Sequence, residues 1–156
     1  MASIHDEILI EVPAEAAWDA LRDLGALHTR LAVGFVTDCR LEADGTARQV
    51  TFANGMRARE LIVAVDEALC RVAWSAAGGR LTHHNASAQL LEAGAGRCRL
   101  VWVADLLPHE MARVIAPMLR QGLLAMKRTL EAASPRNETG ASTAPHAGPT
   151  GSPAPA

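Results

Sequence analysis

The chain has 156 residues, of which 49% are hydrophobic but only 3% aromatic, so it suits a single domain whose core is mainly aliphatic. Acidic and basic residues are interspersed, and the formal net charge is −2, which argues against a nucleic-acid-binding surface or a polybasic membrane anchor. Three cysteines without a CxxC pair indicate neither a disulfide framework nor a zinc site.

The N-terminus does not resemble an export signal. Asp6 and Glu7 stand where a signal peptide needs a cationic and then an apolar segment, and no later run is apolar enough to span a membrane. We therefore expect a cytoplasmic protein that does not insert into membranes.

The first third of the chain begins with one strand and one or two short helices. Apolar and polar residues alternate over residues 4–12, which predicts a strand with one face turned inward. Pro13 ends this strand and suits the first turn of a helix that reaches Leu24, where Gly25 is a natural stop. Residues 26–33 leave open a second short helix.

Six further strand-like runs follow in quick succession. They cover residues 35–42, 46–53, 56–66, 70–76, 82–92 and 97–106. Asp44-Gly45 and Asn54-Gly55 join the first three, and both dipeptides favour the tight turns of β-hairpins because they tolerate positive φ. Consecutive hairpins predict an antiparallel meander, with only the first strand added out of order.

The residues from 109 to 133 predict a long amphipathic helix. Its apolar stripe comprises Met111, Val114, Ile115, Met118, Gly122, Met126 and Leu130. Their spacing of three and four suits a helix of about seven turns that packs on the apolar face of the sheet. Pro117 predicts a kink or a restart. Gly122 indicates either close packing against the sheet or access for a ligand.

The composition changes at Ser134. The last 23 residues contain five prolines and no aliphatic side chain larger than alanine, so they cannot bury enough surface to fold. We predict a folded domain over residues 1–133 and a disordered tail over 134–156 that is dispensable for stability.

Several stretches resemble one known superfamily. They are the run from Ile10 to Trp18, the segment Gly79 to Thr82, Leu100 to Asp105 with Pro108 after it, and Gly122 to Glu131. In this order and spacing they are similar to START-like proteins, also called SRPBCC or polyketide cyclase/dehydrase-like proteins. The resemblance implies an α+β helix-grip fold, in which a curved seven-stranded antiparallel sheet wraps around a long C-terminal helix over a hydrophobic cavity.

Glu60 is the first candidate for chemistry. It alternates in register with Met56, Ala58, Ile62 and Ala64, so we expect it on the concave face. Members of the superfamily often carry an acid near this place. In an apolar cavity such a carboxylate could act as a general acid or base. It could equally form a structural ion pair with an arginine such as Arg48.

His84 is the second candidate, because it is in register with Ala86, Ala88 and Leu90. In relatives a cavity-lining tyrosine often takes this place. His84 could bond a ligand oxygen or share a proton with Glu60, or it could be a core histidine bonded to a backbone carbonyl. The adjacent His83 faces the other side of the strand, so the pair is a poor metal chelate.

The glycines at 94 and 96 form no phosphate loop, and we expect neither metal nor cofactor.

The remaining candidates are apolar residues expected on the cavity wall. They are Phe35, Ile62, Ala86, Trp102, Met118 and Gly122. We expect Trp74 to belong to the core instead. Three functions remain open: binding of a small hydrophobic molecule of lipid, polyketide, quinone or aromatic type; a cyclase or dehydrase that uses Glu60 and His84 for proton transfer; and, more weakly, a protein-interaction or co-chaperone-like module.

Overall fold

The computed structural model describes residues 1–134. The predicted tail, from residue 135 onward, lies outside the described residues. Seven strands form one antiparallel sheet, and their bounds differ from the predicted ones by no more than two residues at either end. The strands are β1 (Ala2–Ile10), β2 (Val36–Leu41), β3 (Ala47–Phe52), β4 (Arg57–Asp66), β5 (Arg71–Ser75), β6 (His83–Glu92) and β7 (Cys98–Leu107).

The strand order is β1-β7-β6-β5-β4-β3-β2, so strands 2 to 7 form the predicted meander and β1 pairs with β7. Between β1 and β2 lie the helix α1 (Ala14–Leu21) and a π-helical turn, η1 (Leu27–Leu31), which is the second short helix left open above. A 3-10 turn, η2 (His109–Met111), leads into the long helix α2 (Ala112–Ala133). This is the helix-grip fold that the resemblance implied.

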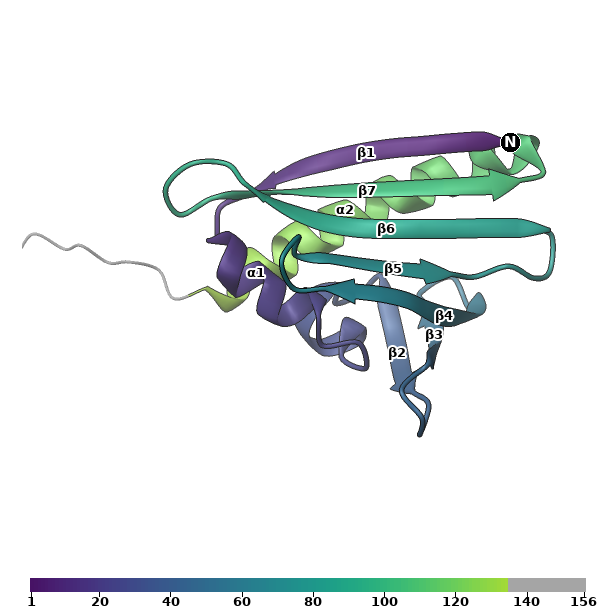
Figure 1. Cartoon of the computed structure of the whole chain (residues 1–156), viewed down its shortest axis with the longest axis horizontal. Coiled ribbons are helices and arrows are strands. Elements are labelled where there is room, and N and C mark those ends of the chain that lie inside the picture. The colour runs from purple at the N-terminus through teal and green to yellow at the C-terminus, as the bar shows by residue number, and fades with distance from the viewer. Residues whose placement is uncertain (135–156) are drawn as a thin grey trace, which may run out of the picture.

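Helix α2 lies along β1 and β7, as Figure 1 shows. Leu119, Leu123 and Met126 are at most 6% exposed and are among the residues that α2 contributes to the core. Val114, by contrast, is 45% exposed, so the predicted stripe is not packed against the sheet at this position. The helix continues through Pro117 without a restart.

The free edge of β1 is covered by polar side chains from α2. Lys127 donates to the carbonyl of Leu9 at 2.8 Å, and Arg120 donates to that of Glu7 at 3.2 Å. Glu131 accepts from the backbone N–H of Glu11 at 3.0 Å. Because an edge strand otherwise offers free hydrogen-bonding groups to other chains, these contacts both fix the helix on the sheet and protect its edge.

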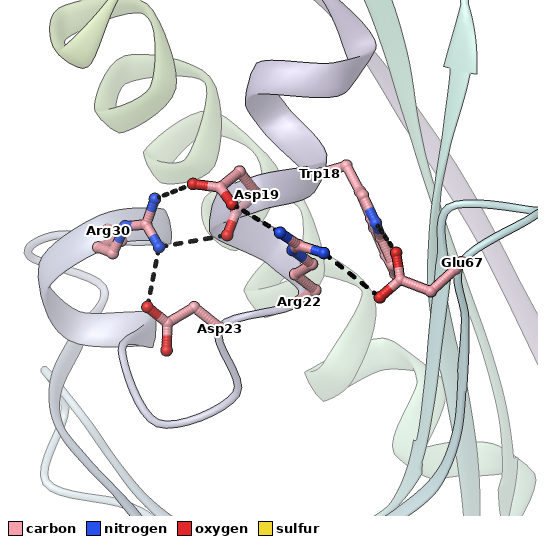
Figure 2. A network of polar contacts seen from close by, with 6 residues as sticks. All are labelled: Trp18, Asp19, Arg22, Asp23, Arg30 and Glu67. Atoms are coloured by element: carbon pink, nitrogen blue, oxygen red, sulfur yellow. Dashed lines mark hydrogen bonds and ion pairs between the residues drawn. The ribbon is translucent and has the colours of Figure 1, made fainter.

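A polar network joins α1 and η1 to the turn between β4 and β5 (Figure 2). Arg30 bonds Asp19 at 2.7 Å and Asp23 at 2.8 Å, and the Trp18 indole donates to Glu67 at 2.7 Å. The arginine ion pairs of this network are largely exposed, so each contributes little by itself. Together they hold the short helices over one end of the concave face.

Among residues 1–134, no helix is long and apolar enough to cross a membrane.

Candidate ligand-binding cavity

A cavity of about 540 Å³ lies between the sheet and the N-terminal half of α2. Its volume is within the usual range for small-molecule sites. Its inner wall is predominantly apolar and includes Phe35, Phe52, Trp74, Ala104, Met118 and Leu119. The first turns of α2, as far as Met118, therefore form a wall of this cavity, which explains the exposure of Val114.

The cavity opens where β4 and β5 separate. Strand β4 pairs with β5 only over Leu61–Asp66, whereas its first residues, 57–60, pair only with β3. On the opposite side, residues 76–81 connect β5 to β6 and also line the cavity. The sheet thus leaves a gap beside the start of β4, and exposed residues on both sides of this gap form the mouth.

Glu60 faces the cavity and takes part in a buried ion pair. Its Oε2 accepts from Arg48 Nε at 2.7 Å, and the two side chains are only 9% and 4% exposed. Arg48 also donates to the carbonyl of Leu24 at 3.4 Å, and its guanidinium carbon lies 5.5 Å from the centre of the Trp74 ring. The ion pair proposed from sequence as an alternative is therefore present. Glu60 Oε1 has no hydrogen-bond partner among residues 1–134, so it can accept from a ligand.

His84 lines the same cavity from β6. Its Nδ1 accepts a hydrogen bond from the backbone N–H of Ala76 at 3.2 Å, whereas the sequence suggested a bond to a backbone carbonyl. Burial, and secondarily the neighbouring His83, lowers the pKa of His84 below its usual 6.5. The ring is thus neutral at pH 7 and carries its proton on Nε2. In the described part of the chain His84 and Glu60 share the cavity without bonding each other.

Aromatic rings close the inner end of the cavity. Trp74 and Trp102 meet edge to face with centroids 5.7 Å apart, and Phe35 meets Phe52 in the same way at 5.4 Å. All four rings also line a second void of only about 40 Å³ behind them, room for about one water molecule. The rings therefore separate the cavity from the packed core. Trp74 is part of the core, as predicted from the sequence, and also lines the cavity.

Gly122 allows this arrangement. A Cβ built there would lie 2.8 Å from Cζ3 of Trp102, closer than side chains pack, and 3.1 Å from Cε1 of Phe35, which is tighter than most such contacts. Of the two interpretations drawn from sequence, the structure shows close packing of rings against the helix backbone. Gly122 itself is buried beneath these rings and does not line the cavity.

The other predicted wall residues divide into two groups. Phe35, Trp102 and Met118 line the cavity, whereas Ile62 and Ala86 do not. Ala86 is 2% exposed within the core, and Ile62 lies beside a register shift in β4, opposite Trp74.

Sequence reasoning missed most of the mouth. The connection between β5 and β6 contributes Ala76 to Leu81, and β4 contributes its first residues. Irregular connections have no periodicity from which a facing side could be read. Phe52 could have been predicted as a wall residue, because it is a large apolar side chain that ends a strand just before the Asn54-Gly55 turn.

Within residues 1–134, no three His, Cys, Asp or Glu side chains lie together in a possible metal site.

Comparison with known proteins supplies a family and a set of related folds. A family model described as polyketide cyclase / dehydrase and lipid transport matches residues 1–131. No curated protein matches the chain significantly.

Among solved structures, an uncharacterised protein from Bacillus thuringiensis superposes with a TM-score of 0.74 at 14% identity, over 83% of this chain and 98% of that one. The di-domain ARO/CYC protein BexL gives 0.73 at 14% identity, over 84% of this chain and 47% of that one. Truncated norcoclaurine synthase from Thalictrum flavum gives 0.64 at 20% identity, over 83% and 91%. At such identities these likenesses show the fold alone.

Proposed function

Because the chain belongs to the polyketide cyclase / dehydrase and lipid transport family, we propose that it binds a small hydrophobic molecule in the cavity between the sheet and α2. The family and the fold support a ligand-binding or cyclase-type role. The observation that carries the proposal is the cavity of about 540 Å³, whose largely apolar wall contains a few polar groups, among them Glu60 and His84.

The apolar wall supplies the affinity. A ligand that buries about 250 Å² of apolar surface gains roughly 6 kcal/mol at about 25 cal/mol per Å², before the costs of association are subtracted. Even before these costs, this gain corresponds to a Kd of only tens of micromolar, so tighter binding needs a larger buried area or polar contacts. A hydrophobic body is therefore necessary for the ligand, and polar groups decide its orientation.

Glu60 and His84 provide that orientation. Glu60 Oε1 accepts hydrogen bonds, and His84, whose Nδ1 is occupied by the N–H of Ala76, donates through Nε2. A ligand with a hydroxyl and a carbonyl group matches this pair of an acceptor and a donor. Both groups belong to strands rather than to loops, which keeps their positions fixed.

The second candidate is a cyclase or dehydrase that uses the same two residues. It is supported by one observation, that a carboxylate and a neutral imidazole line one cavity. In this arrangement Glu60 Oε1 is the group that can accept a proton, whereas His84 donates a hydrogen bond through Nε2 because its Nδ1 is occupied by the N–H of Ala76. This role needs a bound substrate that reaches both side chains.

Native mass spectrometry of the protein purified from its own host tests the proposal, because a bound molecule appears as a mass increment that is lost on denaturation. A thermal-shift screen with lipids, polyketides, quinones and aromatic compounds complements it. Met118→Trp places a larger ring in the cavity and should reduce the shift, whereas Leu124→Trp, on the exposed side of α2, should preserve it. If no compound binds, an interaction role becomes the better explanation.

A further inference from the structure

We infer that the ligand of this cavity is an amphiphile with one anionic group, which stays at the mouth beside Arg57 and Arg80 while its apolar body lies inside. The inference rests on the proposed function and names the chemical class of the molecule: a carboxylate, sulfonate or phosphate attached to a hydrophobic body. It is carried by the distribution of charge around the cavity.

Three arginines but only one acid line the cavity: Arg57, Arg59, Arg80 and Glu60. Two of these charges are already compensated. Glu60 pairs with Arg48 at 2.7 Å, and Arg59 pairs with Glu42 at 2.7 and 2.8 Å. Within the described chain, neither Arg57 nor Arg80 has an ion-pair partner. Two uncompensated positive charges therefore remain at the cavity of a protein whose formal net charge is −2.

The two arginines lie on opposite sides of the opening. Arg57 begins β4, where that strand has no partner on the β5 side, and Arg80 belongs to the connection between β5 and β6. Arg57 alternates with Glu60 along β4 and so leaves the strand on its outer face, but it stands at an edge without a neighbouring strand. Both arginines are exposed, so their long side chains can reach round this edge to a group bound at the mouth. Guanidinium groups present several donors in a fixed fork, which suits carboxylate, sulfonate and phosphate oxygens.

The interior of the cavity fixes the direction of the ligand. Its inner wall is largely apolar, and burying an unpaired anion there would be costly. The buried charges nearest the interior, Glu60 and Arg48, already pair with each other, so they offer no free cation to an anion inside. An anionic end therefore stays at the mouth, where water and two cations solvate it, and the apolar end points toward Trp102.

A matched pair of fluorescent probes tests this inference. 8-Anilinonaphthalene-1-sulfonate and N-phenyl-1-naphthylamine share one aromatic body, but only the first carries a negative charge. In the full-length Arg57→Gln/Arg80→Gln variant, the Kd of the sulfonate should rise about tenfold, as expected for the loss of two charge-assisted contacts at an exposed site. The Kd of the neutral probe should change less than about twofold, within the spread for surface substitutions.

Two further variants control for location and for folding. Arg97→Gln removes the same charge in the turn between β6 and β7, away from the cavity, and should leave both probes unaffected. Val114→Glu places an acid at an exposed position of α2 that lines the cavity, and should selectively weaken binding of the sulfonate. Raising the salt concentration should weaken sulfonate binding in the native protein, but not in the double variant.

Displacement of the neutral probe then identifies the head group. Dodecanoate or dodecyl phosphate should displace it at lower concentration than dodecanol does, and the better of the two anions indicates a carboxylate or a phosphate ligand. Equal displacement by dodecanol, or equal responses of both probes to the arginine substitutions, would overturn the inference while leaving the proposed function intact. If the Met118→Trp variant binds both probes as the native protein does, the cavity is not their site and both proposals fail.

Discussion

Arg48 Nε lies 2.7 Å from Glu60 Oε2, and the two residues face each other directly across β3 and β4. Their side chains are 4% and 9% exposed, so the pair has exchanged most of its water for protein contacts. A buried pair of this kind contributes less than its attraction suggests, because both charges lose their hydration. Removing one partner is a different matter, since the other charge then remains buried alone.

We therefore expect Arg48→Met to lower the free energy of unfolding by about 3 to 5 kcal/mol. Arg48→Met/Glu60→Leu should recover most of this loss, because neither charge is then buried. Urea denaturation measures both effects. Arg59→Gln breaks the exposed pair with Glu42 and should change the urea midpoint little. If Arg48→Met and Arg59→Gln had the same urea midpoint, burial of the Arg48–Glu60 pair would not be what makes its loss destabilising.

Glu60→Gln separates binding from catalysis. Glutamine keeps the shape of the side chain and can still bond Arg48 and a ligand, but it cannot transfer a proton. A binding protein should retain most of its affinity for a ligand found in the thermal-shift screen. A cyclase or dehydrase should bind its substrate yet turn over roughly 10²-fold more slowly or worse. Unchanged turnover would exclude Glu60 as the proton-transfer group.

Gly122→Ala should destabilise the protein even though alanine favours helices by about 1 kcal/mol. The added methyl group would lie 2.8 Å from Trp102, and overpacking of this kind costs about 1 to 3 kcal/mol. In the Trp102→Leu background the same substitution should be neutral or stabilising, so a double-mutant cycle measures the coupling. Gln121→Ala, at an exposed neighbouring position, is the control for helix propensity. Additive effects would mean that the ring does not press on the helix.

Met126→Asp should prevent folding, because it buries an unpaired carboxylate between α2 and the sheet, where Met126 is 6% exposed. Leu124→Asp, at a position that is 41% exposed, should be tolerated. Circular dichroism with thermal melting distinguishes the two. A cooperative melt of Met126→Asp would show that this face of the helix is not the core.

His84 should make the protein less stable in mild acid. Its pKa is lowered in the folded state, so the unfolded chain takes up the proton first as the pH falls. Its contribution is fully present above about pH 6.5, the ordinary value, and is lost as the pH drops through the lower folded pKa. His84→Gln should therefore lose less stability between pH 7 and 5 than the native protein, whereas exposed His5→Gln should behave as native. Equal losses in all three proteins would show that His84 is not responsible.

The sequence alone determined the frame of this molecule. Alternation along the strands placed Glu60 and His84 on the inner face, and the turn at Asn54-Gly55 brought Arg48 within range of Glu60. These are local properties: side chains alternate with period two, and glycine after asparagine or aspartate favours a tight turn whatever the rest of the chain does.

The tertiary structure decided which inward side chains pack and which leave a space. Periodicity placed Gly122 on the same face of α2 as Met118, but only the position of the Trp102 ring buries the first and leaves the second on the cavity wall. Likewise, Arg57 and Arg80 flank one opening because β4 and β5 separate before Leu61. Such results depend on the distance between neighbouring elements, which is set by the volumes of all the side chains that lie between them. No short stretch of sequence contains that information.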